Sequence, residues 1–138
     1  MADATRVVDY YYTMISDKPG EGGRVLRTLR DARVNLLALS AFPSQRKSQV
    51  DFIPENPAAF AAAAKAAKIK LKGPKKVFLI DGDDRVGALS DVLAKLGVAK
   101  VNVTAVDAVC SGMGRFGALL WVKPKDLKKA AAALGVML

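Results

Sequence analysis

The sequence predicts an α+β fold built from two tandem copies of a β-α-β-β-α-β unit. Three observations predict it: an internal repeat, the alternation of strand-like and helical hydrophobic periods within each copy, and the turn residues that separate the segments. At 138 residues the chain has room for one ordinary domain or two small ones, because small domains start at about 50 residues.

The repeat is anchored by two similar turns, DKPG at Asp17–Gly20 and DRVG at Asp84–Gly87 (87 − 20 = 67). The same offset pairs Leu26 with Leu93, Leu29 with Leu96, Asn35 with Asn102, Pro57 with Pro124, and Phe60 with Leu127. Shared apolar spacing, a shared asparagine and a shared proline at one offset favour duplication over chance. We therefore predict two domains, residues 1–72 and 73–138, with a linker near Gly73 and Pro74.

The first copy can be assigned segment by segment from its hydrophobic periods. Strand formers in YYYTMI predict a strand that ends at the turn signal SDKPG. A helix from about Gly20 to Arg33 is predicted by apolar residues on one helical face, Val25, Leu26, Leu29 and Ala32. A hairpin of VNLLALSAF and QVDFI should end at Pro54, and PAAFAAAAKAAK predicts a helix that starts at Pro57. The short segment IKLK is expected to close the unit as a strand.

The second copy repeats this order. KVFLID predicts a strand, GALSDVLAKLG a helix from Gly87, VNVTAVDAV and FGALLWV a hairpin, PKDLKKAAAALG a helix from Pro124, and VML a closing strand. This element order is that of the ferredoxin-like sandwich, an antiparallel four-stranded sheet covered on one face by two helices. A domain of about 65 residues buries little surface, so we expect the two sheets or their faces to pack together.

The segment ISDKPGEGGRVLRTLRDARVNLLAL resembles the signature of ACT domains: a strand, a short Asp- or Asn-containing turn with Pro-Gly, a helix, and an asparagine that opens the next strand. The second copy keeps Asp84, Gly87, Leu89 and Asn102, but it has Val86 where proline is usual and a turn two residues longer. The resemblance implies regulatory binding of a small ligand, usually an amino acid, where two such domains pair side by side.

The ligand-binding residues predicted from this resemblance are Asp17, Lys18, Pro19, Gly20, Asn35, Asp84, Arg85, Gly87 and Asn102. A helix N-terminus after Gly20 or Gly87 offers backbone N–H groups and partial positive charge to a ligand carboxylate. Asp17 or the amide oxygen of Asn35 could accept hydrogen bonds from an ammonium group. The residues also fit an ordinary turn with a helix cap. The combination favours binding in the first copy, and both interpretations stay open for the second.

The sequence carries no recognised catalytic or metal-binding motif. It has no histidine, the commonest general base and metal ligand, and its one cysteine, Cys110, cannot make a thiolate zinc site. The acidic cluster in IDGDDRVG lacks the later glutamate of a calcium loop. GMGRFG, Gly112–Gly117, satisfies GxGxxG but precedes a strand, which predicts a hairpin turn. We therefore predict a protein without enzymatic activity, catalytic residues, metal or cofactor, with Cys110 as a buried thiol.

The net charge of +9 could attract a nucleic acid or a membrane surface. The lysines gather in KIKLKGPKK and in the last predicted helix, mostly between or opposite apolar positions, which favours a solvated face. RNA binding on the sheet and a ligand-free oligomerisation module are kept as alternatives to the regulatory function.

Partners and location follow from the same reasoning. The expected ligand is an amino acid or a similar small carboxylate, and open sheet edges predict a homodimer. With no catalytic or DNA-binding segment recognised in the sequence, the output should pass through a regulated metabolic enzyme or transporter. No apolar run approaches the roughly 20 residues that span a bilayer, and the first residues do not resemble a secretion signal, so we expect no membrane partner and a cytoplasmic location.

Overall fold

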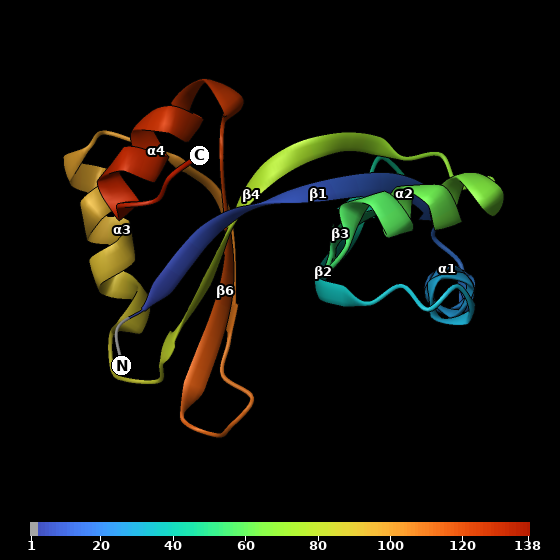
Figure 1. Cartoon of the computed structure of the whole chain (residues 1–138), viewed down its shortest axis with the longest axis horizontal. Helices are drawn as coiled ribbons and strands as arrows, with labels where there is room; N and C mark the ends of the chain where they lie inside the picture. The colour runs from blue at the N-terminus through green and yellow to red at the C-terminus, as the bar shows by residue number, and fades with distance from the viewer. Residues whose placement is uncertain (1–2) are drawn as a thin grey trace. The chain divides into compact units, whose positions relative to one another are not determined.

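The computed structural model describes residues 3–138 and places their strands in one sheet with the order β2-β3-β1-β4-β6-β5 (Figure 1). The chain separates into two compact units. One is Asp9–Lys75; the other, named here the Lys76–Leu138 unit, also includes the N-terminal segment up to Val8. Two long strands, β1 (Ala4–Ser16) and β4 (Lys72–Asp83), each cross from one unit into the other.

The Asp9–Lys75 unit contains α1 (Glu21–Asp31), β2 (Leu36–Ser44), β3 (Lys47–Pro54) and α2 (Pro57–Ala66), with its strands in the order β2-β3-β1-β4. Strand β3 pairs antiparallel with both β1 and β2. The two helices pack on one face of these strands. Their shared core consists of Tyr11, Val25, Leu29, Val50, Phe52 and Phe60.

The helix starts of this unit follow the turn chemistry of the sequence. Gly20 is the N-cap of α1, and Asn56 is the N-cap of α2, where its side chain accepts a 3.1 Å hydrogen bond from the Ala59 N–H. Pro57 occupies the first turn of α2, where its missing N–H is not needed. The predicted starts near Gly20 and Pro57 are therefore confirmed.

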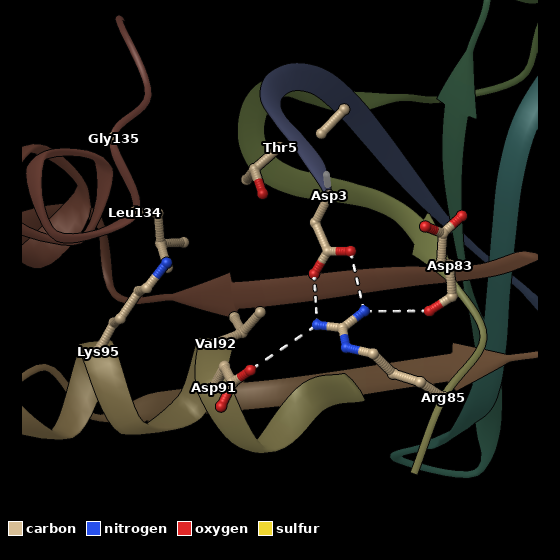
Figure 2. A pocket seen from close by; sticks show the side chains of 10 residues that line it. Asp3, Thr5, Asp83, Arg85, Asp91, Val92, Lys95, Leu134 and Gly135 are labelled. Carbon is tan, nitrogen blue, oxygen red and sulfur yellow. Dashed lines mark hydrogen bonds and ion pairs between the residues drawn. The ribbon is translucent and has the colours of Figure 1, made fainter. Parts of the chain in front are cut away.

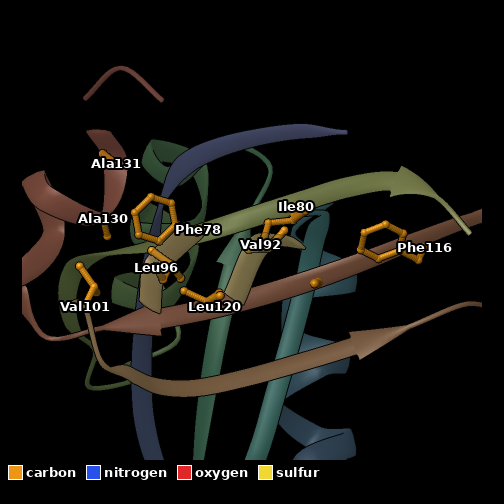
Figure 3. Packing of buried hydrophobic residues seen from close by; sticks show 10 residues of the cluster. Phe78, Ile80, Val92, Leu96, Val101, Phe116, Leu120, Ala130 and Ala131 are labelled. Carbon is orange, nitrogen blue, oxygen red and sulfur yellow. The ribbon is translucent and has the colours of Figure 1, made fainter. Parts of the chain in front are cut away.

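The Lys76–Leu138 unit contains α3 (Ala88–Val98), β5 (Val103–Val109), β6 (Arg115–Val122), the short 3₁₀ helix η1 (Pro124–Asp126) and α4 (Leu127–Leu134). The predicted starts near Gly87 and Pro124 are confirmed, although the second begins as a 3₁₀ turn. Figure 3 shows the core, in which Phe78, Ile80 and Leu120 of the sheet pack with Leu96 of α3 and Ala130 of α4.

Two predicted closing strands are wrong. Residues 69–71 of IKLK are not in a strand; β4 begins at Lys72 and continues through Gly73 and Pro74, so these two residues are not a linker. The segment VML (136–138) is not a strand either. In the sheet order, β1 lies beside β4, and Val7 of β1 packs on the core of the Lys76–Leu138 unit. A strand from the start of the chain therefore replaces the predicted last strand.

Two further expectations differ from the structure. The sequence predicted two four-stranded sheets, whereas residues 3–138 form one six-stranded sheet because β1 and β4 are long enough to be shared. Cys110 is exposed rather than buried, because it directly follows β5, an edge strand whose residues after Val103 are all exposed. The division into domains 1–72 and 73–138 stays a prediction; the compact units differ from it in the placement of the N-terminal segment.

Left-handed backbone positions recur in the two units. Each pair below is separated by 67 positions, and its φ values are positive: Gly20 (91°) and Gly87 (75°), Arg33 (59°) and Lys100 (59°), Gln45 (51°) and Gly112 (106°), Arg46 (67°) and Met113 (64°), and Lys68 (59°) and Gly135 (70°). These residues lie at helix ends and in hairpin turns, where a left-handed residue reverses the chain. GMGRFG accordingly forms the β5–β6 hairpin turn, as predicted.

Candidate functional site

The turn between β1 and α1 brings together four predicted site residues, Asp17, Lys18, Pro19 and Gly20. The Lys18 N–H donates a 2.9 Å hydrogen bond to the Ser16 carbonyl, which tightens the turn. Gly20, with its φ of 91°, caps α1 without a side-chain hydrogen bond. The N–H groups of Gly22 and Gly23 lie in the first turn of the helix, so no carbonyl of a preceding helical turn accepts their hydrogen bonds. This helix start can therefore donate hydrogen bonds to an anionic group.

A cavity of about 190 Å³ lies beside this turn. Val25, Val50 and Phe52 supply part of its apolar lining, and Asp17 and Lys18 supply charges of both signs. The volume is below the roughly 300 Å³ at which drug-sized pockets begin. A small molecule with a carboxylate, an ammonium group and an apolar part matches this lining.

Asn35 does not join these residues within the unit. It follows α1, whose 11 residues span about 16 Å, so it lies at the opposite end of that helix from Gly20. Its side-chain amide donates a 3.1 Å hydrogen bond to the Glu55 carboxylate, and its carbonyl accepts from the Glu55 N–H at 3.0 Å. Asn102 has the same place in the other unit, exposed between α3 and β5.

The turn between β4 and α3 carries the other predicted residues, Asp84, Arg85 and Gly87. Gly87 has a φ of 75° and caps α3 without a side-chain hydrogen bond, as Gly20 does for α1. The Asp84 N–H donates a 2.9 Å hydrogen bond to the carbonyl of Gly114 in the β5–β6 hairpin, which ties the two loops together.

Arg85 is engaged by carboxylates of its own chain (Figure 2). Its two terminal nitrogens donate one hydrogen bond each to the two oxygens of Asp3, both at 3.0 Å. The guanidinium also donates to the carbonyl of Asp83 at 3.0 Å and lies 3.8 Å from the Asp91 carboxylate. Hydrogen bonding from Arg85 lowers the pKa of Asp3 below its ordinary value.

A cavity of about 610 Å³ adjoins this cluster. Its lining comes from the start of β1, the β4–α3 turn, α3 and the end of α4, and includes Thr5, Lys95 and Leu134. Charged groups of both signs therefore line a cavity that is larger than the one at the β1–α1 turn.

Sequence reasoning missed Asp3 and Glu55. Glu55 could have been foreseen, because in an antiparallel hairpin the residue before β2 lies opposite the residue after β3. Asp3 gave no local signal, since it lies 82 positions from Arg85. Among residues 3–138, no group of three or more His, Cys, Asp or Glu side chains is arranged to hold a metal ion. In the same part of the chain, no helix has the length and apolar character needed to cross a membrane.

The element order and the sheet define an α+β fold of the ferredoxin-like type. No protein-family model and no curated protein matches the sequence. Solved structures match the fold. Protein BT0572 from Bacteroides thetaiotaomicron is 18% identical with a TM-score of 0.82, over 95% of this chain and 88% of that one.

Two further similar structures are regulatory subunits of aspartate kinase. The subunit from Thermus thermophilus is 13% identical with a TM-score of 0.66, over 98% of this chain and 96% of that chain. The subunit from Thermus flavus is 12% identical with a TM-score of 0.64, over 98% and 95%. At these identities the likeness concerns the fold.

Proposed function

We propose that this protein is a non-catalytic regulatory protein that binds a small carboxylate ligand, most simply an amino acid, at the turn between β1 and α1. The observation that carries the proposal is the cavity of about 190 Å³ at this turn, which is lined by Asp17 and Lys18, by Gly22 in the first turn of α1, and by apolar side chains. The similarity in fold to regulatory subunits of aspartate kinase supports it.

The ligand would use the charges of this turn in a defined way. Its carboxylate would accept hydrogen bonds from the N–H groups of Gly22 and Gly23, where the helix dipole is positive, with Lys18 close by. Its ammonium group would meet Asp17. Its side chain would lie against Val25 and Phe52. Gly20 starts the helix in a left-handed conformation and has no side chain to cap it. The N–H groups of the first turn therefore stay accessible to the ligand.

Asn35 would complete the site from a second copy of the chain. Its distance from Gly20 along α1 prevents it from reaching a ligand held at Gly20 of the same unit. A homodimer that pairs two such units side by side, as ACT domains do, would bring the Asn35 of one protomer near the turn of its partner. Binding and dimerisation would then be coupled, because each ligand would contact both protomers.

The chain is best interpreted as a tandem pair of ACT-like domains. The sequence offset of 67 positions is supported by backbone geometry, because the five pairs of left-handed residues follow the same offset. Sequence landmarks and left-handed turn positions therefore follow one offset, which favours a duplication over chance. We keep 1–72 and 73–138 as the repeated segments.

The biological output would be the control of another protein in the cytoplasm, a metabolic enzyme or a transporter. A ligand-free oligomerisation module is the competing function, favoured by the exposed edge strand β5, in which every residue after Val103 is exposed. A thermal-shift screen of the twenty amino acids at millimolar concentration distinguishes the two functions. A saturable rise in Tm for one amino acid supports the sensor, and no rise for any of them supports the oligomerisation module.

A further inference from the structure

Asp3 and Arg85 form an ion pair with a defined geometry. The carboxylate and the guanidinium meet with two parallel hydrogen bonds of 3.0 Å, the arrangement in which both partners are fixed in orientation. The exposed fractions are 22% for the Asp3 side chain and 40% for the Arg85 side chain, so the guanidinium lies at the surface and the carboxylate is the more buried partner.

Gly82 has no side chain, and the Asp3 carboxylate occupies the space where a Cβ would lie. Gly82 is buried in β4, and a Cβ added to it would collide with the Asp3 carboxylate and with the Phe116 ring. The carboxylate is thus seated against the backbone of β4, and its lowered pKa keeps it ionised. The Asp83 carbonyl holds the guanidinium from a third direction at 3.0 Å.

The two helix-start turns differ in two respects. Lys18 and Arg85 occupy equivalent positions in the offset of 67, and each lines a cavity of its own unit. Lys18 forms no ion pair with any of residues 3–138, whereas Arg85 pairs with the carboxylate of Asp3. The cavity at Arg85, about 610 Å³, is also the larger of the two.

We propose that Asp3 acts as an internal carboxylate that closes a second ligand site at Arg85, and that this site takes the carboxylate of an amino acid when Asp3 is displaced. Asp91, near the guanidinium, would then face the ammonium group of the ligand, and the cavity would hold its side chain. This proposal rests on the proposed function and adds to it: an intact chain binds at the Gly20 turn, and its second site is held closed by its own N-terminal segment.

The test is an NMR titration of the full 138-residue chain with glycine, the smallest molecule that carries both an α-carboxylate and an α-ammonium group. Backbone amide signals of Gly20 and Gly22 report the first site, and those of Asp84 and Gly87 report the second. Five variants are compared with the wild type: Asp3→Asn, Asp3→Ala, Asp3→Glu, Asp81→Asn, and Asp3→Asn combined with Arg85→Gln. Asp81→Asn is the matched control, because it removes the same charge from the same unit, at a carboxylate that pairs with Arg115 and does not line the cavity.

In Asp3→Asn, glycine should shift the Asp84 and Gly87 signals with a Kd roughly tenfold or more below that of the wild type, because a charge-assisted pair no longer competes. Asp3→Glu and Asp81→Asn should behave as the wild type, and adding Arg85→Gln should remove the gain. Acetate should shift the same signals as glycine, and methylammonium should not. Equal Kd values for Asp3→Asn and the wild type would overturn the proposal, as would a response to methylammonium alone.

Two outcomes separate this proposal from neighbouring explanations. If glycine and the other amino acids leave Gly20 and Gly22 unshifted while the second site responds in Asp3→Asn, the proposed function at the first turn fails and the internal carboxylate stands. The dispersion of the NMR signals reports whether each variant is folded. If Asp3→Asn and Asp3→Ala are both unfolded while Asp3→Glu is folded, Asp3 has a structural role alone and the proposal is wrong.

Discussion

The side-chain amide of Asn35 donates a 3.1 Å hydrogen bond to the carboxylate of Glu55, at the end of α1 remote from Gly20. The asparagine that sequence analysis assigned to the ligand is therefore held by a neighbouring carboxylate within its own unit. A ligand contact of Asn35 requires a second protomer, which makes the dimer part of the binding prediction.

We expect Asn35→Ala to weaken amino-acid binding roughly tenfold, the effect of losing one hydrogen bond to a charged ligand group. Asn102→Ala is the matched control in the other unit and should leave the affinity at the Gly20 turn unchanged. Isothermal titration at a protein concentration that keeps the dimer, with circular dichroism to check folding, provides the comparison. Equal losses in the two variants would contradict the assignment of Asn35.

Gly20→Ala and Gly22→Ala should change stability in opposite directions. Gly20 has a φ of 91°, where an alanine is strained by about 1 kcal/mol, whereas Gly22 is helical with open space around its Cα and should gain about 0.5–1 kcal/mol. Urea denaturation of both variants measures the difference. A Gly20→Ala protein as stable as the wild type would show that this turn does not require the left-handed residue.

Gly20→Val tests the same turn for binding. A branched side chain in the left-handed region distorts the helix start and should abolish ligand binding more completely than Asn35→Ala does. Isothermal titration measures the affinity. The backbone amide NMR signal of Gly87, in the other unit, shows whether the rest of the chain stays folded. Unchanged affinity in a folded Gly20→Val protein would place the ligand elsewhere.

The Asp3–Arg85 pair should make stability depend on pH in the acid range. Because the pKa of Asp3 is lowered by Arg85, its stabilisation is present above the ordinary carboxyl pKa and is lost as the pH falls through the lowered value. The urea midpoint of Asp3→Asn should therefore lie below that of the wild type at about pH 7, and the two should converge below about pH 4. The difference should also shrink in high salt, since the pair is partly exposed. A constant difference across this pH range would mean that Asp3 stabilises the fold by packing instead.

Phe60 should be the most sensitive core position of the Asp9–Lys75 unit. It is 1% exposed, and its ring centroid lies 5.2 Å from that of Tyr11 and 5.3 Å from that of Phe52. Phe60→Ala should cost about 3–5 kcal/mol in unfolding free energy. Leu26→Ala, at a residue that is 40% exposed, is the control and should cost much less. Denaturant unfolding that gives similar losses for both would contradict the assigned core.

Short stretches of sequence predicted much of the fold. Helix starts at Gly20, Pro57 and Gly87 were predicted because capping residues and a helical apolar period lie within a few positions of one another. The GxGxxG segment was correctly assigned to a hairpin for the same reason, since the strand-like residues that follow it are adjacent.

The candidate site was predictable only in part. The sequence located the turn from Asp17 to Gly20, but it grouped Asn35 with this turn because the family pattern names both residues without stating which protomer supplies each. It also could not foresee that Arg85 would be held by Asp3, because nothing near either residue indicates the other.

The sequence by itself determined which segments form helices, where the chain turns, and that no histidine serves as a base, because these properties depend on residue type and local spacing. Only the tertiary structure decided which strand closes the Lys76–Leu138 unit, and it chose the start of β1 over residues 136–138. The physical reason is that strand pairing joins backbones that are remote in sequence. Any extended apolar segment can supply the hydrogen bonds, so the choice rests on strand length and packing over the whole chain.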